Sequence, residues 1–518
     1  MSNKKSTIIN ACAALITFIV QMFISFWLSP FVVGRLGEEA YGFINLANNF
    51  ISYASLITVM INSMASRYIS VEYNSGRKEE AKKYYSTVFI ANCFLFFLII
   101  IFSILLISRL EMIINISEHL VFQVKVSFLL SFINMGVSLL GTVYTSATFT
   151  TNKMHYNSII QIISNVIKSI LIFALFTIFP AKIYYFSSAV LIAGIVTLFG
   201  NYFVAKKLFN DFYIKINFFS FKKLVVLIKS GVWVLISNIS NLLLSGLDLL
   251  FSNWFINSAI MGRLSLAKQI PYAFSSTLGI FSNIFSSSLT KAYISEGKDG
   301  LIDEVSSQLK ILTVIFTVPY AGIIAFGNCF LTLWLNNANY TVIQLNEIYL
   351  LMIIVLFDII ISTYMYSIHS VFIALDKVKI YSVVLLIASL ISVSVTLVLL
   401  KVTSLGVFAI AATSTVVLGF THGVIVPALA AKLLNESVGL FWKNEIKSWF
   451  MLFIISIVFF IIVEIVTISN WIEFFTYIFI AGILGYILTW IIAFDKKERK
   501  DIINLFKSKI NKFFLKKC

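Results

Sequence analysis

Long, uninterrupted apolar runs recur from one end of this chain to the other. An α-helix needs about 20 apolar residues to cross the roughly 30 Å hydrocarbon core of a bilayer, and most of these runs are long enough. Inside hydrocarbon the backbone must satisfy its own hydrogen bonds, as a helix does. The sequence therefore predicts an all-α polytopic membrane protein with about 14 transmembrane helices. The predicted spans are 8–33, 41–66, 84–108, 121–150, 158–179, 183–205, 230–256, 263–290, 309–334, 347–373, 381–400, 405–430, 446–468 and 472–494.

Composition and charge favour a membrane protein and argue against a nucleic-acid partner. Hydrophobic residues make up 59% of the chain and charged residues 12%, whereas a soluble domain carries about 25% charged residues. The net charge of +16 comes from lysines and arginines that gather in alternate connections between the spans. Because cytoplasmic loops hold the positive excess, we expect both termini in the cytoplasm.

The two ends of the chain are basic. Lys4 and Lys5 precede the first apolar run as in a signal peptide, but no small-residue cleavage site follows, so we interpret the run as an uncleaved first helix. The tail at 495–518 places apolar residues at helical spacing between lysines. This basic amphipathic segment is predicted either to lie in the interface against anionic lipid or to act as a basic stop after the last span.

Three short sequence words are repeated at offsets of 220, 225 and 224 residues. The pairs are Gly42, Leu46 and Ala47 with Gly262, Leu266 and Ala267; Tyr68, Ile69 and Ser70 with Tyr293, Ile294 and Ser295; and Lys153 and Ser158 with Lys377 and Ser382. The repeat predicts two six-helix lobes related by an axis along the membrane normal, plus two extra helices. The predicted domains are an N-terminal lobe at 1–205, a cytoplasmic linker at 206–229, a C-terminal lobe at 230–432, the extra helices at 433–494 and the tail at 495–518.

Polar side chains inside the predicted spans are candidates for a substrate site. A charged side chain at the bilayer centre costs about 2.5–3.5 kcal/mol, so such groups usually face a bundle interior or a water-filled cavity. Amides and a few cations suit an anionic, hydroxyl-rich ligand. The candidate substrate-binding residues are Lys168, Lys268, Asn48, Asn45, Asn241, Arg35 and Arg263. Structural alternatives stay open, because Lys268 can pair with Asp248 to fix helix packing and the two arginines can anchor spans at the interface.

Asp248, Asp358 and His369 are candidates for gating or ion coupling. Asp248 lies among leucines in the seventh span. Asp358 and His369 lie 11 residues apart in the tenth span, a spacing that puts them on one face of a continuous helix. Histidine at such a position is also a common packing residue. No cofactor is expected, and coupling to protons, to sodium or to the membrane potential is left open.

Two stretches resemble a known family. Gly34 to Gly42 reads Gly-Arg-Leu-Gly-Glu-Glu-Ala-Tyr-Gly, which resembles the L-G-x-x-x-Y-G signature of the polysaccharide flippases. These proteins move O-antigen and other oligosaccharide repeat units and belong to the multidrug/oligosaccharidyl-lipid/polysaccharide exporter superfamily. Asp248 to Ala267 resembles the family's junction of the seventh and eighth spans, although Met261 stands where the pattern has a small turn before an aromatic residue.

The resemblance implies a flippase that carries an undecaprenyl-diphosphate-linked oligosaccharide across the bacterial cytoplasmic (inner) membrane by alternating access. Its product is expected to serve O-antigen, lipopolysaccharide or capsule synthesis. Lys168 and Lys268 are then expected to contact the diphosphate or acidic sugars, and Asp248 to set the local charge or to form a gate with Lys268. The implied partners are the lipid-linked oligosaccharide, membrane lipid, and a polysaccharide polymerase with chain-length proteins. No nucleic acid is expected.

Three other functions fit the sequence pattern less well. A cation-coupled multidrug exporter of this fold is expected to line its cavity with acidic and aromatic residues, and the two buried lysines argue against it. A peptidoglycan-precursor flippase shares the physics, but more arginine is expected in its first two spans. An enzyme is not expected, because the sequence lacks a sizeable external loop, a clustered His/Asp constellation and a P-loop.

Overall fold

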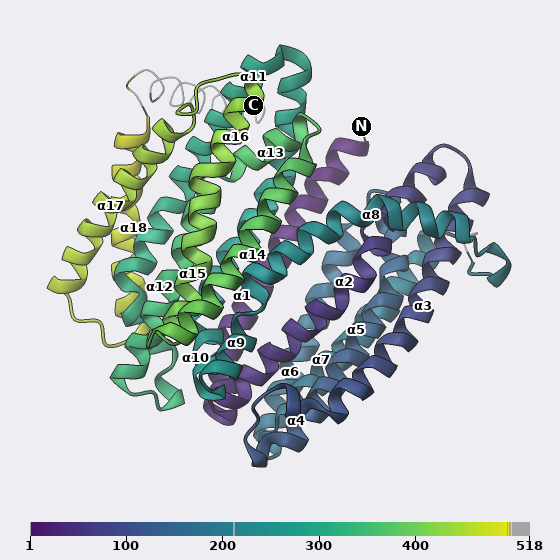
Figure 1. The fold of residues 1–518 in the computed structure, drawn as a ribbon, viewed down its shortest axis with the longest axis horizontal. Coiled ribbons are helices and arrows are strands. Elements are labelled where there is room, and N and C mark those ends of the chain that lie inside the picture. Colours follow the sequence, from purple (N-terminus) through teal and green to yellow (C-terminus); the bar gives the residue numbers. More distant parts are fainter. Residues whose placement is uncertain (1, 211–212, 495, 497–498, 500–518) are drawn as a thin grey trace, which may run out of the picture. The chain divides into compact units, whose positions relative to one another are not determined.

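The computed structural model describes residues 2–210, 213–494, 496 and 499, without the side chains at 2–5, 7, 8, 11, 280–287, 290, 291 and 444. Within this part of the chain every regular element is a helix (Figure 1). The all-α architecture predicted from the apolar runs is therefore confirmed. The predicted tail at 495–518 lies almost entirely outside the described residues.

The chain folds into two compact units, of which the first comprises Met1–Leu266, Asn337–Asn339 and Ser382–Ser414. In this unit α5 packs against α2, α3 and α7. α6 packs between α7 and α1, and α8 packs on α2. Figure 1 shows α2, α5 and α3 side by side. Its helices are α1 (Ser2–Leu36), α2 (Glu38–Asn74), α3 (Lys78–Ser108), α4 (Leu110–Ile113), η1 (Glu118–Leu120), α5 (Val121–Thr150), α6 (His155–Ile178), α7 (Ile183–Leu208), η2 (Ile216–Phe218), α8 (Phe221–Asn241), the π-helix η3 (Leu242–Gly246), α9 (Asp248–Phe255), α10 (Ser258–Ala267) and most of α14 (Val378–Val402).

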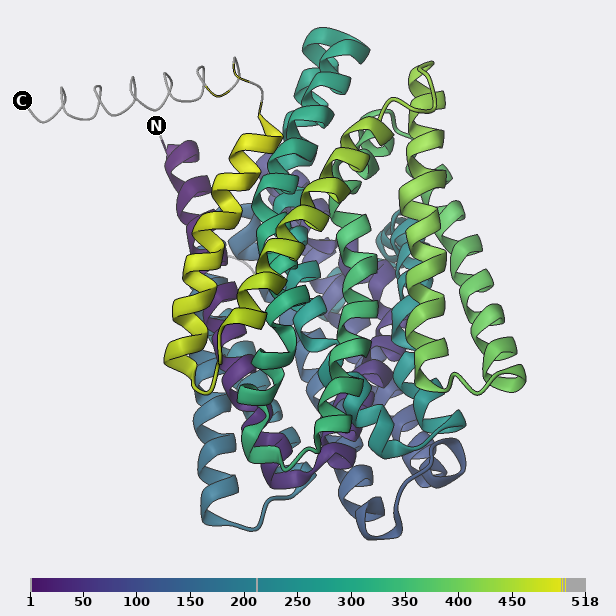
Figure 2. The ribbon, with the colours of Figure 1, turned by 90° about the vertical axis from the view of Figure 1, so that its left-hand side faces the viewer.

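The second unit is built around the long helix α11, which contacts α12, α13, α17 and α18. Figure 2 shows α17 and α18, the predicted extra helices, lying side by side. They pack on α11 through a buried core that includes Phe316, Phe326, Phe459 and Phe474. Its helices are α11 (Gln269–Trp334), α12 (Val342–Tyr364), α13 (Tyr366–Ala374), the π-helix η5 (Thr421–Ile425), α16 (Val426–Leu434), α17 (Trp442–Ile465) and α18 (Trp471–Ala493). Two further helices, η4 (Asn336–Ala338) and α15 (Val407–Phe420), have residues in both units.

Thirteen helices in the described part of the chain are long and apolar enough to cross a membrane. Each corresponds to one predicted span. The remaining prediction, 263–290, is helical along α10 and the first part of α11, and several of its side chains lie outside the described residues. α11 continues into the next predicted span and is interrupted by a non-helical backbone at Gly297 (φ 70°, ψ −145°), a conformation that glycine adopts without steric cost.

The residue ranges of the two units differ from those of the predicted lobes. The seventh and eleventh predicted spans, 230–256 and 381–400, belong almost entirely to the first unit by their contacts. The units follow packing density, whereas the lobes follow the sequence repeat. The division into lobes at 205 and 230 therefore stays a prediction.

Candidate translocation site

In the first unit, α2 and α10 touch backbone to backbone. A Cβ placed on Gly42 would lie 3.0 Å from the Cα of Gly262, and one placed on Gly262 would lie 2.0 Å from the carbonyl oxygen of Glu38. No other residue fits at Gly262 without moving the helices apart, because a backbone neighbour cannot rotate away. Gly42 and Gly262 are the glycines of the first repeated word, so the repeat meets itself at this crossing.

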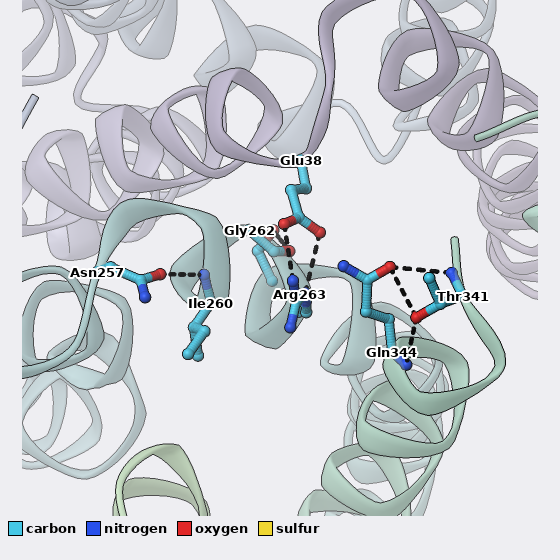
Figure 3. A network of polar contacts seen from close by, with 8 residues as sticks. Glu38, Asn257, Ile260, Gly262, Arg263, Thr341 and Gln344 are labelled. Atoms are coloured by element: carbon cyan, nitrogen blue, oxygen red, sulfur yellow. Dashed lines mark hydrogen bonds and ion pairs between the residues drawn. The ribbon is translucent and has the colours of Figure 1, made fainter. Parts of the chain in front are cut away.

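An ion pair lies beside this crossing (Figure 3). The guanidinium of Arg263 donates from Nε to Oε2 of Glu38 and from a terminal nitrogen to Oε1, both at 3.0 Å. The two side chains are only 16% and 20% exposed, and the fork geometry is the stronger form of such a pair. Arg263, predicted to contact substrate, is thus held by the carboxylate of Glu38, which is not one of the predicted site residues.

Further polar contacts join the same end of the unit. The carboxylate of Glu39 accepts hydrogen bonds from the hydroxyls of Ser117 (2.7 Å) and Ser258 (2.8 Å). We call Glu38, Glu39, Ser117, Ser258 and Arg263 the α2–α10 latch. Its members tie the start of α2 to the start of α10 and to the segment before α5. In the predicted topology these helix ends face the outside.

Hydrogen bonds between Asn115 and Asn253 also hold the segment before α5, by tying it to α9. The side chain of Asn253 accepts from the backbone N–H of Asn115 at 2.8 Å and donates to its carbonyl at 2.9 Å, while the amide of Asn115 donates to the carbonyl of Asn253 at 2.8 Å. Asn253 is fully buried. A buried amide with both its donor and acceptor paired fixes the separation of the two backbones.

The asparagines of α2 are arranged along η3 and α10. Asn45 donates to the hydroxyl of Ser265 at 3.4 Å and to the carbonyl of Tyr41 at 3.1 Å. Asn49, which is not one of the candidate substrate-binding residues, donates to the carbonyl of Gly246 at 3.0 Å, and the Tyr53 hydroxyl donates to the same oxygen at 2.5 Å. Because Gly246 ends a π-helix, whose wider turn displaces backbone groups from regular pairing, these side chains supply partners for its carbonyl.

Three more candidates of the first unit lie on or beside these helices. Asn48 is exposed on α2, and Asn241 is exposed at the end of α8 just before the π-helix. Asp248 begins α9 just after the π-helix and is buried, with 6% of its surface exposed. The structure therefore groups Asn45 and Asn48 on α2 and places Asn241 and Asp248 at the two ends of η3.

Lys168 and Arg35 lie on other helices of the first unit. Lys168 is half-buried on α6, and its ammonium donates to the side-chain oxygen of Asn165 at 3.1 Å. Arg35 is exposed in the last turn of α1, with its guanidinium carbon 5.8 Å from the ring centre of Phe31. α1 and α6 pack against each other. The prediction that these cations meet a substrate remains untested.

Lys268 belongs to the second unit and lies between α10 and α11. It is 3% exposed, and its ammonium lies 5.4 Å from the ring centre of Tyr272. A cation over an aromatic face is stabilised by the negative charge density of the ring. A buried lysine at this depth of the fold matches the expectation for an internal cation, while its contact with a ligand stays a prediction.

Asp358 lies in a hydrogen-bonded row that the sequence did not reveal. Its carboxylate accepts from the hydroxyl of Ser362 at 3.4 Å, and the Ser362 hydroxyl lies 3.0 Å from Nδ1 of His422 in the π-helix η5. The helix assumed to join Asp358 to His369 is interrupted at Met365, between α12 and α13. His369 instead has its ring 4.3 Å from that of Tyr381.

Some polar groups inside the bundle were missed altogether. Asn62 and Asn92 exchange amide hydrogen bonds at 3.1 and 2.9 Å, and Thr142 donates to the side-chain oxygen of Asn62 at 2.9 Å. Asn92 also donates to the carbonyl of Leu139 at 2.9 Å. This network ties α2, α3 and α5 together. A single asparagine within an apolar run was the signal available for each.

Comparison with known proteins gives the family and the fold. The family model described as "Polysaccharide biosynthesis protein" matches residues 4–285. The membrane protein EpsK of Bacillus subtilis (strain 168), itself described as uncharacterized, is 25% identical over 438 residues, which cover 85% of this chain and 86% of EpsK.

Two solved structures share the fold at low sequence identity. The lipid II flippase MurJ, in an inward closed conformation, aligns with a TM-score of 0.69 and 17% identity over 93% of this chain and 98% of that one. An inward-facing multidrug resistance MATE transporter of the MOP superfamily aligns with a TM-score of 0.68 and 13% identity over 81% and 99%. Since the family model covers more than half of the chain, the protein belongs to the polysaccharide biosynthesis protein family.

Proposed function

We propose that this protein is a flippase that moves oligosaccharide repeat units, linked to undecaprenyl diphosphate, across the cytoplasmic membrane for surface polysaccharide synthesis. The family supports a role in polysaccharide biosynthesis. The observation that carries the choice of ligand is Lys268, a lysine with 3% of its surface exposed in a chain built of membrane-length helices. A lysine within membrane-length helices usually faces a bundle interior or a water-filled cavity, where its positive charge can attract an anionic head.

The driving force follows from the charge of this ligand. A sugar head cannot enter hydrocarbon without losing its hydration, whereas the polyprenyl tail can stay in lipid, so the protein needs only a polar path for the head. An inside-negative potential favours outward movement of an anion by about 2.3 kcal/mol per charge at 100 mV. The lysines Lys168 and Lys268 would hold the diphosphate on this path.

Alternating access requires that one end of the path stays closed while the other opens. We assign the closed outer end to the α2–α10 latch, because its ion pair and hydroxyl contacts join helix ends that face outward in the predicted topology. Release of the substrate outside would break the contact between Glu38 and Arg263. Arg263, once freed, would present a cation to the departing diphosphate.

Coupling to a proton gradient is supported by the row of Asp358, Ser362 and His422. A carboxylate, a hydroxyl and an imidazole within hydrogen-bonding distance can hold one proton and pass it along. We propose this row as the coupling site, with Asp248 as a gating residue. Both termini are proposed to face the cytoplasm, and a polymerase with chain-length proteins is proposed to receive the product.

The function can be tested in cells by deleting the gene and then expressing the wild-type protein or a variant in the deletion strain. Wild type and Lys401→Ala, whose lysine is exposed in the last turn of α14, should restore surface polysaccharide and clear the lipid-linked repeat units that accumulate. The double variant Lys168→Ala/Lys268→Ala should not, at equal protein level. Full restoration by the double variant would remove the lysines from the mechanism. A deletion that changes sensitivity to cationic drugs but not polysaccharide would favour the exporter.

A further inference from the structure

The second unit contains an open groove that the proposed translocation path does not use. It has a volume of about 460 Å³ and runs between α12, the π-helix η5 and α17. Its walls are almost entirely apolar. The lining residues include Ile361, Gly423, Val424, Trp442, Glu445 and Trp449. A cleft of this size is suited to a small ligand or to the head of a lipid.

The backbone of η5 shapes the groove. Gly423 in η5 and Gly419 near the end of α15 line the groove without side chains, and a Cβ on Gly423 would lie 3.4 Å from the carboxylate of Glu445. The indole of Trp442 donates to the carbonyl of Gly423 at 2.9 Å. The hydrogen bond therefore holds the Trp442 side of the groove against the π-helix, where regular backbone pairing is lost.

Glu445 is the charged residue among those lining the groove. One of its oxygens accepts a long hydrogen bond, 3.4 Å, from the indole of Trp449. Among the described residues no lysine, arginine or histidine forms an ion pair with it. A carboxylate among apolar walls is costly unless a cation or a strong donor approaches it, so the groove is complementary to a positive charge.

The surroundings of the groove indicate that its occupant comes from the bilayer. On α17, Ile446, Phe450 and Phe453 are 68%, 59% and 64% exposed, which leaves an apolar stripe open next to the carboxylate. Glu445 lies in the first turn of α17, near two tryptophans, and tryptophan is enriched at the level of lipid headgroups. An amphiphile can place its head at Glu445 and its chains along this stripe.

We propose that this groove binds a membrane lipid with a primary ammonium headgroup, of the phosphatidylethanolamine class. The ammonium would donate hydrogen bonds to Glu445 and lie against the faces of Trp442 and Trp449, where aromatic rings attract cations. A primary ammonium can donate to the carboxylate, and a choline head cannot. The proposal does not rest on the proposed flippase function, since the residues that line the groove are not among those proposed to hold the oligosaccharide.

Quenching of tryptophan fluorescence by brominated lipids tests this site. The full-length protein is titrated in detergent with phosphatidylethanolamine, phosphatidylcholine or phosphatidylglycerol carrying the same brominated chains. Phosphatidylethanolamine should quench at concentrations at least tenfold lower than the other two. In Glu445→Gln this preference should disappear. It should persist in the control Glu464→Gln, whose carboxylate is exposed near the other end of α17.

Several outcomes overturn the proposal. Equal quenching by all three lipids in the wild type excludes a headgroup-specific site, and equal quenching by the ethanolamine and choline lipids excludes recognition of N–H donors. A preference that survives Glu445→Gln excludes the carboxylate. Should Glu445→Gln fail to fold, titration of the wild type with mono- and dimethylated phosphatidylethanolamine decides. Affinity should fall stepwise with methylation, and no change would refute the donor role.

Discussion

The side-chain amide of Asn45 donates a hydrogen bond to the hydroxyl of Ser265, its counterpart 220 residues later in the chain. The glycines of the same repeated word, Gly42 and Gly262, are also in contact. In a duplicated chain, a residue meets its own counterpart only close to the axis that relates the two copies. If the chain is duplicated as the repeat predicts, the axis that relates the two copies is therefore expected to pass close to the crossing of α2 and α10.

This crossing depends on the absence of a side chain at Gly262. In Gly262→Ala the new methyl group meets the backbone oxygen of Glu38 and pushes the helices apart, at a cost of about 1–3 kcal/mol in the free energy of unfolding. Thermal unfolding of the purified protein, followed by intrinsic fluorescence, should show a lower midpoint. Gly322→Ala is the control, because no atom lies within 4 Å of a Cβ there; it should leave the midpoint unchanged or raise it. An unchanged midpoint in Gly262→Ala would contradict the close approach.

The Glu38–Arg263 ion pair should hold the outer end of the path closed. Arg263→Gln leaves the Glu38 carboxylate without its partner and removes charge-assisted hydrogen bonds worth about 1.5–3 kcal/mol. In a background without the four native cysteines, Ser265→Cys should then react several-fold faster with a membrane-impermeant maleimide applied to intact cells.

Reversing both charges provides the matched control for this pair. Glu38→Arg with Arg263→Glu recreates the ion pair in the opposite sense and should return the labelling rate of Ser265→Cys close to that of the starting protein. Equal rates in the single variant and in the intact pair would show that the latch does not control access.

Proton coupling is predicted to depend on Asp358. Asp358→Asn keeps a hydrogen bond to Ser362 sterically possible, but an amide cannot bind and release a proton as a carboxylate does. Flipping in vesicles should therefore lose its acceleration by an imposed pH gradient. Residual flipping without a gradient should persist. Asp376→Asn, in an exposed turn with φ 54° that asparagine also tolerates, should respond to the gradient like the wild type. A gradient response retained by Asp358→Asn would show that Asp358 is not the coupling group, and no response in the wild type would point to sodium or to the membrane potential.

Hydropathy predicted the helices well because it reads the same quantity that places them in a membrane. The predicted span at 121–150 coincides with α5, and 183–205 lies within α7. α11 was less predictable, since its helical segments run on into the polar stretch around Glu296 and Asp299 from both sides and are interrupted there only at Gly297. Hydropathy marks where a helix leaves hydrocarbon and says nothing about where the helix itself ends.

The candidate site was predictable only in part. Buried Lys268 and Asp248 stood out because each is a charge within an apolar run. The partners were not predictable, because the pairing of Arg263 with Glu38 depends on how α2 and α10 cross. The π-helices η3 and η5 have no periodic signature, so neither the partners of the Gly246 carbonyl nor the row ending at His422 was visible in the sequence.

The most direct measurement is flipping by the purified protein in proteoliposomes. A fluorescent undecaprenyl-diphosphate-linked oligosaccharide is placed in both leaflets, and external dithionite destroys the fluorescence that reaches the outer leaflet. The wild type and Lys401→Ala should expose the inner-leaflet pool, and Lys168→Ala/Lys268→Ala should do so at least tenfold more slowly, which corresponds to about 1.4 kcal/mol or more in the barrier. Flipping at the wild-type rate by the double variant, or none by the wild type beyond protein-free vesicles, would contradict the account.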